Sequence, residues 1–173
     1  MGRVIIPRTS VANFETPLLF LAGPILSAPN WHDHAIEILF SYDPDITIAS
    51  PRRGVRESIA AYLVQGKYNF SRQRAWERHY LDRASKTGAI LFWLPGEAEH
   101  SCEKVYGAMT RLELGQWMTK YTYDPSIRFC VGSEGLFSEL RTIAYDLQVD
   151  APDKEIKKTL EETCVEALRL ARQ

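Results

Sequence analysis

The amino-acid sequence predicts an α/β fold in which helices cover both faces of a parallel sheet. Short, nearly continuous apolar runs alternate along the chain with stretches whose apolar residues recur at the spacing of a helical turn. Apolar runs of this kind are typical of strands that are buried on both faces. Strands that alternate with helices imply right-handed crossovers, and hence a parallel sheet.

Four apolar runs have the composition of buried strands, and each is followed by Gly, Pro or Ser. A shorter run, Val4–Ile6, is a candidate fifth strand. The four runs are Leu18–Ala22, Ile46–Ala49, Ala89–Leu94 and Ile127–Val131.

Five further stretches show the helical period. They lie at 31–39, 70–84, 112–118, 136–147 and 156–171. Gly88 is expected to end the second of them. Asp150 or Asp153 is expected to cap the last, with Pro152 near its first turn.

The length and composition indicate one globular domain spanning residues 1–173. Hydrophobic residues make up 45% of the chain and charged residues 25%, as in ordinary globular proteins. The formal net charge of −1 gives no reason to expect a nucleic-acid polymer or a membrane surface as partner.

The metal-binding residue types lack the spacing of a metal site. The three cysteines, Cys102, Cys130 and Cys164, form no C-x-x-C pair, and no histidine stands at ligand spacing from another ligand. We therefore expect neither a metal nor a disulfide framework. The first residues do not resemble a signal peptide, and no run approaches the roughly 18 apolar residues of a membrane span, so a cytoplasmic location is expected.

Two separate segments point to a single site. The strand Leu18–Ala22 runs into the turn Gly23-Pro24, and Glu113 is expected in the opening turn of a helix. Strand ends and helix starts share one rim of a parallel sheet, where ligands bind. A carboxylate there is suited to attack a sugar carbon and carry the sugar covalently. The alternative is structural, because Thr110-x-x-Glu113 matches a capping box.

A second carboxylate, Asp82, precedes the predicted strand at 89–94. If it faces the same cleft as Glu113, it is a candidate acid/base or sugar anchor. The alternative is a solvated helix carboxylate that is paired with a neighbouring base. The candidate partners are Arg78, Arg83 and Lys86.

Basic and aromatic residues near the same rim are candidates for substrate binding. Arg52 and Arg53 follow the second predicted strand and are suited to clamp a phosphate or a carboxylate, or else lie in a solvated loop. Trp31 follows the Gly23-Pro24 turn and is a candidate for stacking on a base. Arg111 is expected to hold an anion or to pair with Glu103 or Glu113.

Three motifs occur in the order found in a known family. They are the apolar strand that ends in Ala22-Gly23-Pro24, Tyr80-Leu81-Asp82 before Gly88–Leu91, and Arg111–Gly115. In this respect the chain resembles the nucleoside 2-deoxyribosyltransferase family, which includes the related nucleoside-monophosphate N-glycosidases. The resemblance covers roughly residues 18–131.

The resemblance implies a flavodoxin-like (Rossmann-like) fold with a five-stranded parallel sheet. It also implies cleavage or transfer of the N-glycosidic bond of a nucleoside or nucleoside monophosphate, with no cofactor and no metal. Glu113 corresponds to the family nucleophile and Asp82 to the family aspartate, while Ala22, Gly23 and Pro24 line the sugar site. Members are usually homodimers or larger homo-oligomers.

The chain departs from the family pattern at Gly107, where typical transferases carry another aspartate before the nucleophile. Two alternatives therefore stay open beside the leading hypothesis. One is a nucleotide-binding or sensing module that does not turn over its ligand. The other is an N-glycosidase that acts on NAD-like molecules and releases nicotinamide.

Overall fold

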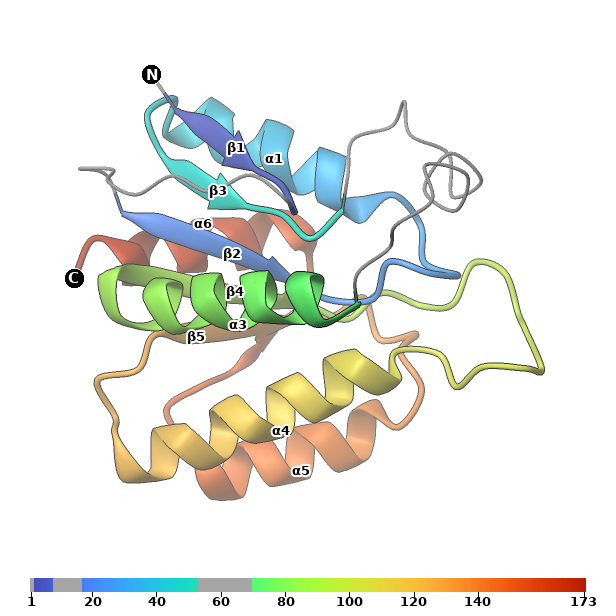
Figure 1. Cartoon of the computed structure of the whole chain (residues 1–173). Helices are drawn as coiled ribbons and strands as arrows, with labels where there is room; N and C mark the ends of the chain where they lie inside the picture. The colour runs from blue at the N-terminus through green and yellow to red at the C-terminus, as the bar shows by residue number, and fades with distance from the viewer. Residues whose placement is uncertain (1, 8–16, 53–69) are drawn as a thin grey trace.

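A computed structural model describes residues 2–7, 17–52 and 70–173, which form an α/β fold (Figure 1). Its sheet has six strands, all parallel, in the order β1-β3-β2-β4-β5-β6. The strands are β1 (Arg3–Ile5), β2 (Leu18–Ala22), β3 (Thr47–Ala49), β4 (Gly88–Trp93), β5 (Phe129–Gly132) and β6 (Ile156–Lys157). The flavodoxin-like α/β class is confirmed, but the expected five strands are six.

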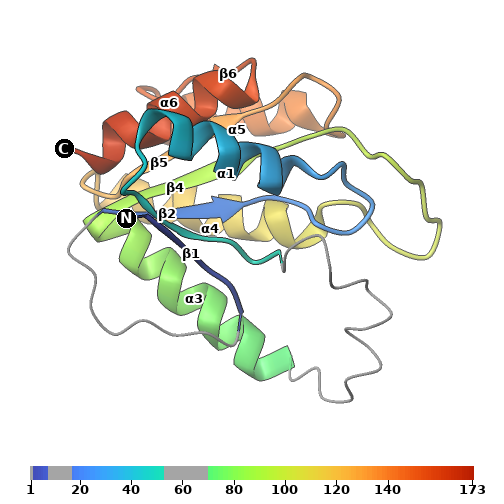
Figure 2. The same ribbon diagram turned by 90° about the horizontal axis from the view of Figure 1, so that it is seen from above.

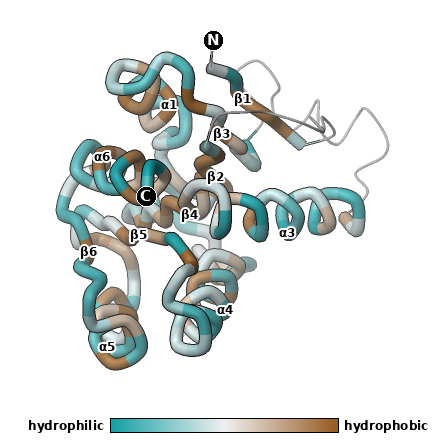
Figure 3. Tube along the Cα trace, turned by 90° about the vertical axis from the view of Figure 1, so that its left-hand side faces the viewer, coloured by the Kyte–Doolittle hydropathy of each residue, from teal (hydrophilic) through white to brown (hydrophobic). Residues whose placement is uncertain are grey.

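Helices cover both faces of the sheet. Within the described residues they are α1 (Trp31–Tyr42), α3 (Phe70–Thr87), α4 (Ala108–Tyr123), α5 (Leu140–Asp150) and α6 (Leu160–Ala171). Figure 3 looks along the strands and shows α1 and α6 on one side of the sheet and α3 and α4 on the other. In the view from above, α1 and α6 lie over the strands, and α3 extends beyond them (Figure 2).

The core consists of two apolar layers, one on each face of the sheet. Side chains of β2 and β4 alternate between the layers, so that Phe20 and Phe92 join the α3 and α4 side while Leu21 and Leu91 join the α1 and α6 side. Every residue of these two strands is buried, as their continuous apolar sequences predict. The strand hydropathy therefore indicates a two-sided core correctly.

The sixth strand was missed because its residues were assigned to the final helix. Ile156–Lys157 pairs with the edge of β5, and α6 begins only at Leu160. Thr159 caps α6 with a full capping box, in which its hydroxyl accepts from the backbone N–H of Glu162. Asp150 and Asp153 do not cap this helix. A two-residue edge strand has too few residues to show a period of its own.

Of two other predicted helix boundaries, one is confirmed and one was wrong. Helix α3 ends at Thr87, directly before Gly88, as predicted. Gly88 is also the first residue of β4, and an added Cβ there would meet the backbone of Leu18 at 1.8 Å. Helix α4 begins at Ala108, after Gly107 in the left-handed conformation with φ 65°. Glu113 therefore lies in the second turn of α4, and Thr110 forms no cap. The capping-box alternative for Glu113 is excluded.

The topology defines where a ligand is expected to bind. From β2 the chain passes through α1 to β3 on one side, and from α3 it returns to β4 on the other side of β2. The strand order thus reverses between β2 and β4, and ligands of open α/β sheets bind beyond the strand ends at such a switch point. None of the helices in the described ranges has the length and hydrophobicity needed to cross a bilayer.

Candidate functional site

The ends of β2 and β4 approach each other closely at the switch point. Gly23 follows β2, and a Cβ at this position would lie 2.4 Å from the carbonyl oxygen of Trp93 and 2.6 Å from the Trp31 ring. Only glycine fits there, for steric reasons. The turn that the sequence marks as part of the site is therefore also required for the packing of the two central strands.

Glu113 lies at this rim, on the buried face of α4, and is only 8% exposed. Its Oε1 accepts a hydrogen bond from Nη1 of Arg74 at 2.5 Å. The same nitrogen donates to Oε2 of Glu77, also at 2.5 Å. One guanidinium group thus serves two carboxylates that come from different helices.

These three side chains, which we call the Arg74 cluster (Arg74, Glu77 and Glu113), are largely withdrawn from water. Their exposed side-chain fractions are 21%, 13% and 11%, respectively. Because each carboxylate oxygen lies 2.5 Å from the same nitrogen, the two oxygens are at most about 5 Å apart, which does not exceed the carboxylate spacing of retaining glycosidases. The cluster carries one formal negative charge when all three groups are ionised.

Burial raises the pKa of Glu113 above its ordinary value. The hydrogen bond and the charge of Arg74 lower this pKa in part, and the Glu77 carboxylate adds to the rise. Desolvation of the carboxylate is therefore the dominant influence, and Arg74 is the group that favours its ionised form. A carboxylate whose pKa is raised by burial and partly lowered by a neighbouring cation is typical of reactive sites.

Neither Arg74 nor Glu77 was identified from the sequence. Glu77 is three residues before Tyr80 and seven before Ala84, so it shares the face of α3 that packs on the sheet. The sequence feature that could have identified them is an oppositely charged pair at i and i+3, Arg74 and Glu77, within the apolar stripe of the helix. Such a position indicates a buried ion pair, because solvated ion pairs lie on the opposite face of an amphipathic helix.

Asp82, the second predicted carboxylate, is not part of the Arg74 cluster. It lies five residues beyond Glu77, which is about 7.5 Å along the axis and about 140° around it. Its side chain is 54% exposed and pairs with Lys86 at 3.0 Å. Helix α3 runs away from the rim towards the start of β4 (Figure 1). Asp82 is in the last two turns of this helix, on the way to the N-terminal ends of the strands. The structure matches the alternative of a solvated helix carboxylate.

Trp31 fixes the turn after β2. Its ring is 3% exposed, and its Nε1 donates to the carbonyl of Pro24 at 2.9 Å within the core. Ala22 and Pro24 are buried beside it. The indole therefore holds the Gly23-Pro24 turn, and in this structure it presents no exposed face for stacking on a base.

His32 is a buried polar residue that sequence reasoning did not single out. It is fully buried, and neither ring nitrogen has a hydrogen-bond partner. Its ring lies against Trp31, with centroids 3.7 Å apart. Burial holds the pKa of His32 well below its ordinary value, and the charge of Arg52 lowers it further. The imidazole is therefore neutral at physiological pH.

The predicted basic residues have different positions. Arg52 follows β3 at the same rim and is partly buried, while Arg53 lies outside the described residues. Arg111 pairs with neither Glu103 nor Glu113. Its guanidinium lies 4.6 Å from the centre of the Phe137 ring and donates to the carbonyl of Tyr106 and to Ser138. Arg111 thus anchors the start of α4.

Gly107, where the family pattern has an aspartate, is required by the backbone. Its φ of 65° is in the left-handed region, and an added Cβ would meet the Phe137 ring at 2.7 Å. An aspartate cannot take this place without rearrangement. The departure from the family pattern therefore has a structural cause in the N-terminus of α4.

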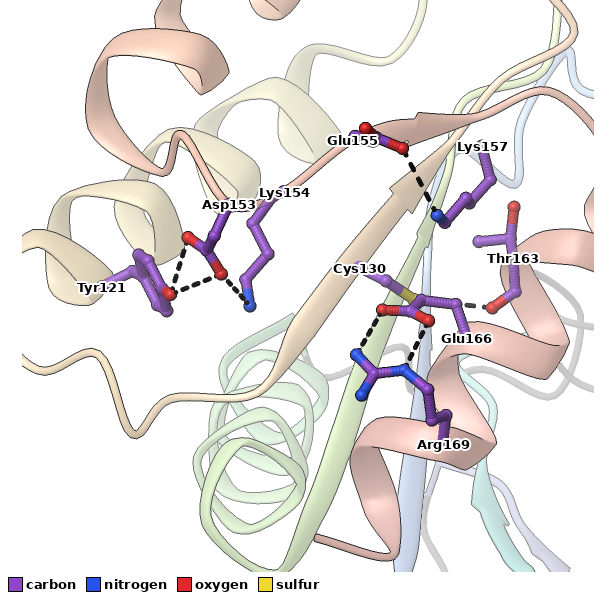
Figure 4. A network of polar contacts seen from close by, with 9 residues as sticks. All are labelled: Tyr121, Cys130, Asp153, Lys154, Glu155, Lys157, Thr163, Glu166 and Arg169. Carbon is purple, nitrogen blue, oxygen red and sulfur yellow. Dashed lines mark hydrogen bonds and ion pairs between the residues drawn. The ribbon is translucent and has the colours of Figure 1, made fainter.

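A second polar cluster lies beside the edge strands β5 and β6, next to helix α6 (Figure 4). A small cavity there is lined by Cys130, Asp153, Lys154, Glu155, Lys157 and Glu166. Each charge has its own partner, since Lys154 pairs with Asp153, Lys157 with Glu155, and Glu166 with Arg169. This one-to-one pairing gives no reason to place a ligand there.

The described residues contain no group of three or more His, Cys, Asp or Glu side chains that is arranged to hold a metal ion. No protein-family model matches the sequence, and no curated protein matches it closely enough to count as a relative.

Proposed function

We propose that the protein cleaves or transfers the N-glycosidic bond of a nucleoside or nucleoside monophosphate through a glycosyl intermediate on Glu113. The observation that carries this proposal is the Arg74 cluster, in which two largely buried carboxylates bind one guanidinium nitrogen at the switch point of the sheet, so that their nearest oxygens are at most about 5 Å apart. This spacing suits a carboxylate that attacks the sugar beside a second group that transfers a proton.

In the proposed reaction, Oε2 of Glu113 attacks C1′ of the sugar while its Oε1 keeps the contact with Arg74. The bond from C1′ to the base nitrogen breaks, and its electron pair leaves with the base. A second carboxyl group passes a proton from solvent to the departing base. We assign this proton transfer to Glu77, in place of Asp82, because Glu77 shares the guanidinium with Glu113.

A second step releases the sugar from Glu113. A water molecule, or a second nucleobase, attacks C1′ from the opposite face, and Glu77 accepts the proton of the attacking group. The bond between C1′ and Glu113 breaks, so that the two displacements together retain the configuration. Arg52 lies at the same rim, and its positive charge would favour the binding of an anionic substrate such as a nucleoside monophosphate.

The proposal is tested by measuring base release with chromatography. The panel holds ribo- and deoxyribonucleosides, their monophosphates and NAD, each with and without a second free base. We expect Glu113→Gln to lower the rate by a factor of at least about 1,000, and Glu77→Gln by about 100. Transfer to the second base would identify a transferase, and release alone a hydrolase.

Asp82→Asn is the matched control, because it removes a carboxylate from the same helix outside the Arg74 cluster. We expect it to leave the rate unchanged. Base release that survives in Glu113→Gln would contradict the proposal. Ligand binding without release from any substrate by the folded wild-type protein would favour the nucleotide-binding module instead.

A further inference from the structure

The loop between β4 and α4 holds a second constellation of reactive side chains, independent of the Arg74 cluster. Nδ1 of His100 lies 3.0 Å from Oε2 of Glu97, and Nε2 of the same ring lies 3.5 Å from Sγ of Cys102. The three side chains are therefore connected in the order carboxylate, imidazole, thiol. With the ring proton on Nδ1, His100 donates to Glu97 and accepts from the Cys102 thiol.

This order is the one that activates a nucleophile. A base within hydrogen-bond reach of a thiol removes its proton, and a third group orients the base. The thiolate, rather than the thiol, attacks electrophiles and disulfides. Cys102 is exposed, so a reagent reaches it directly.

The loop is held by hydrogen bonds on either side of His100 and Cys102. The backbone N–H groups of Ala98 and Glu99 donate to the carbonyl of Ser27 at 2.7 and 3.3 Å. The Tyr106 hydroxyl donates to the carbonyls of Pro95 and Gly96. Figure 1 shows the loop projecting from the edge of the sheet where the strands end.

The other two cysteines provide an internal contrast. Cys130 and Cys164 are buried, and burial raises the pKa of both thiols, that of Cys164 to about 12. They are therefore protonated and shielded from solvent. Their hydrogen-bond partners also differ from that of Cys102, because the Cys130 thiol donates to the carbonyl of Thr163 and the Cys164 thiol to that of Ala35.

We propose that Glu97, His100 and Cys102 form a thiol-activating relay, and that Cys102 is a site of reversible modification by low-molecular-weight disulfides. His100 takes the thiol proton, and the Cys102 thiolate attacks one sulfur of the disulfide. The disulfide bond breaks, and its electron pair leaves on the second sulfur, which takes the proton from His100. Cys102 is oxidised to a mixed disulfide, and the departing sulfur is reduced to a thiol.

The first test uses an aromatic disulfide, 5,5′-dithiobis(2-nitrobenzoate), whose reaction with thiols is followed by absorbance. We expect one thiol per native chain to react rapidly, and the remaining two only after denaturation. Cys102→Ser removes the rapid phase. His100→Gln slows it by about tenfold, less than a buried general base contributes, because His100 is largely exposed.

His34→Gln is the matched control, since His34 is also exposed and also lies beside a glutamate, Glu37, at 3.8 Å. We expect this variant to react at the wild-type rate. A rapid phase in His100→Gln within twofold of wild type would overturn the relay, because Cys102 would then be merely accessible.

The second test incubates the native protein with glutathione disulfide and measures the intact mass. We expect the gain of one glutathione per chain, its absence in Cys102→Ser and its removal by a reductant. Failure of the wild-type protein to gain glutathione would overturn the proposed modification. Neither test depends on base release, so the outcome is separate from that of the proposed N-glycosidic chemistry.

Discussion

The charged side chains at the two ends of helix α3 differ in their burial and in their pairing. In its first half, Arg74 and Glu77 are largely buried and meet Glu113 of α4, so that one cation serves two carboxylates. In its last turns, Asp82 and Lys86 are exposed and pair one to one. The two arrangements are separated by about two turns of the same helix.

This difference shows why a carboxylate alone does not mark a site. Exposed pairs such as Asp82–Lys86 contribute little, because water solvates both partners well. A buried carboxylate that shares its cation with a second carboxylate is destabilising in itself. Such groups are common at active sites. Variants at the two ends of α3 test whether these ends differ in energy as they do in geometry.

The largest effect on stability is expected from Arg74→Met. Removing the guanidinium leaves Glu77 and Glu113 buried without a cation, and breaking such a buried pairing costs about 3 kcal/mol. Lys86→Met at the other end of the helix is expected to cost less than about 0.5 kcal/mol. Urea denaturation at neutral pH measures both values. Equal losses in the two variants would remove the energetic distinction between the ends of α3.

A second comparison sets a buried histidine beside an exposed one on helix α1. His32 is buried without a hydrogen-bond partner, and its pKa is held well below the ordinary 6.5. As the pH falls below 6.5, the unfolded chain binds a proton that the folded protein does not, so stability falls. The loss has a limiting slope of about 1.4 kcal/mol per pH unit.

We expect His32→Leu to remove this loss, and to leave stability at neutral pH equal or higher, because leucine has a similar volume and no polar atoms to satisfy. His34→Leu provides the control, since His34 is exposed. Urea denaturation at pH values between 7.5 and about 5.5 measures the free energy of unfolding of each variant relative to wild type. A slope shared by wild type and His32→Leu would show that the buried imidazole is protonated in the fold.

A smaller effect, of opposite sign, is expected from Glu113. Because burial raises its pKa, the folded protein binds a proton at a higher pH than the unfolded chain does. Stability contributed by this group therefore rises as the pH falls through its folded pKa. Glu113→Gln is expected to be more stable than wild type at neutral pH, with the difference shrinking on acidification. A variant less stable than wild type would indicate that Arg74 outweighs the desolvation.

The smallest effect is expected from Asp82→Asn, because only an exposed pair is lost. Its unfolding free energy should stay within about 0.5 kcal/mol of the wild-type value. A larger loss, measured by the same urea denaturation, would show that the exposed end of α3 also stores stability in its charges.

The parts of the fold that follow from local pattern were predictable from the sequence. The central strands β2 and β4 were predicted because each is buried on both faces and is therefore continuously apolar. The edge strand β6 was not, because two residues show no period. The position of Glu113 in the second turn of α4 depends on the left-handed backbone of Gly107, which packing against Phe137 determines.

The candidate site was predicted only in part, for a related reason. Glu113 and Gly23 stand beside motifs at strand ends, which sequence reading detects. Arg74 and Glu77 act on Glu113 across two helices, and that meeting is set by tertiary packing. Asp82 belongs to the Tyr80-Leu81-Asp82 motif, but it lies on a part of α3 that does not reach the rim. Sequence position identified the rim, whereas tertiary structure determined which carboxylates face each other.

The central claim is that Glu113 carries the sugar covalently, and trapping that intermediate tests it most directly. The wild-type protein is mixed with the substrate that gives the fastest base release, quenched in acid within one turnover, digested and analysed by mass spectrometry. We predict a glycosyl adduct on the peptide that contains Glu113, and none in Glu113→Gln. An adduct on a different residue, or a sugar product of inverted configuration, would contradict the account.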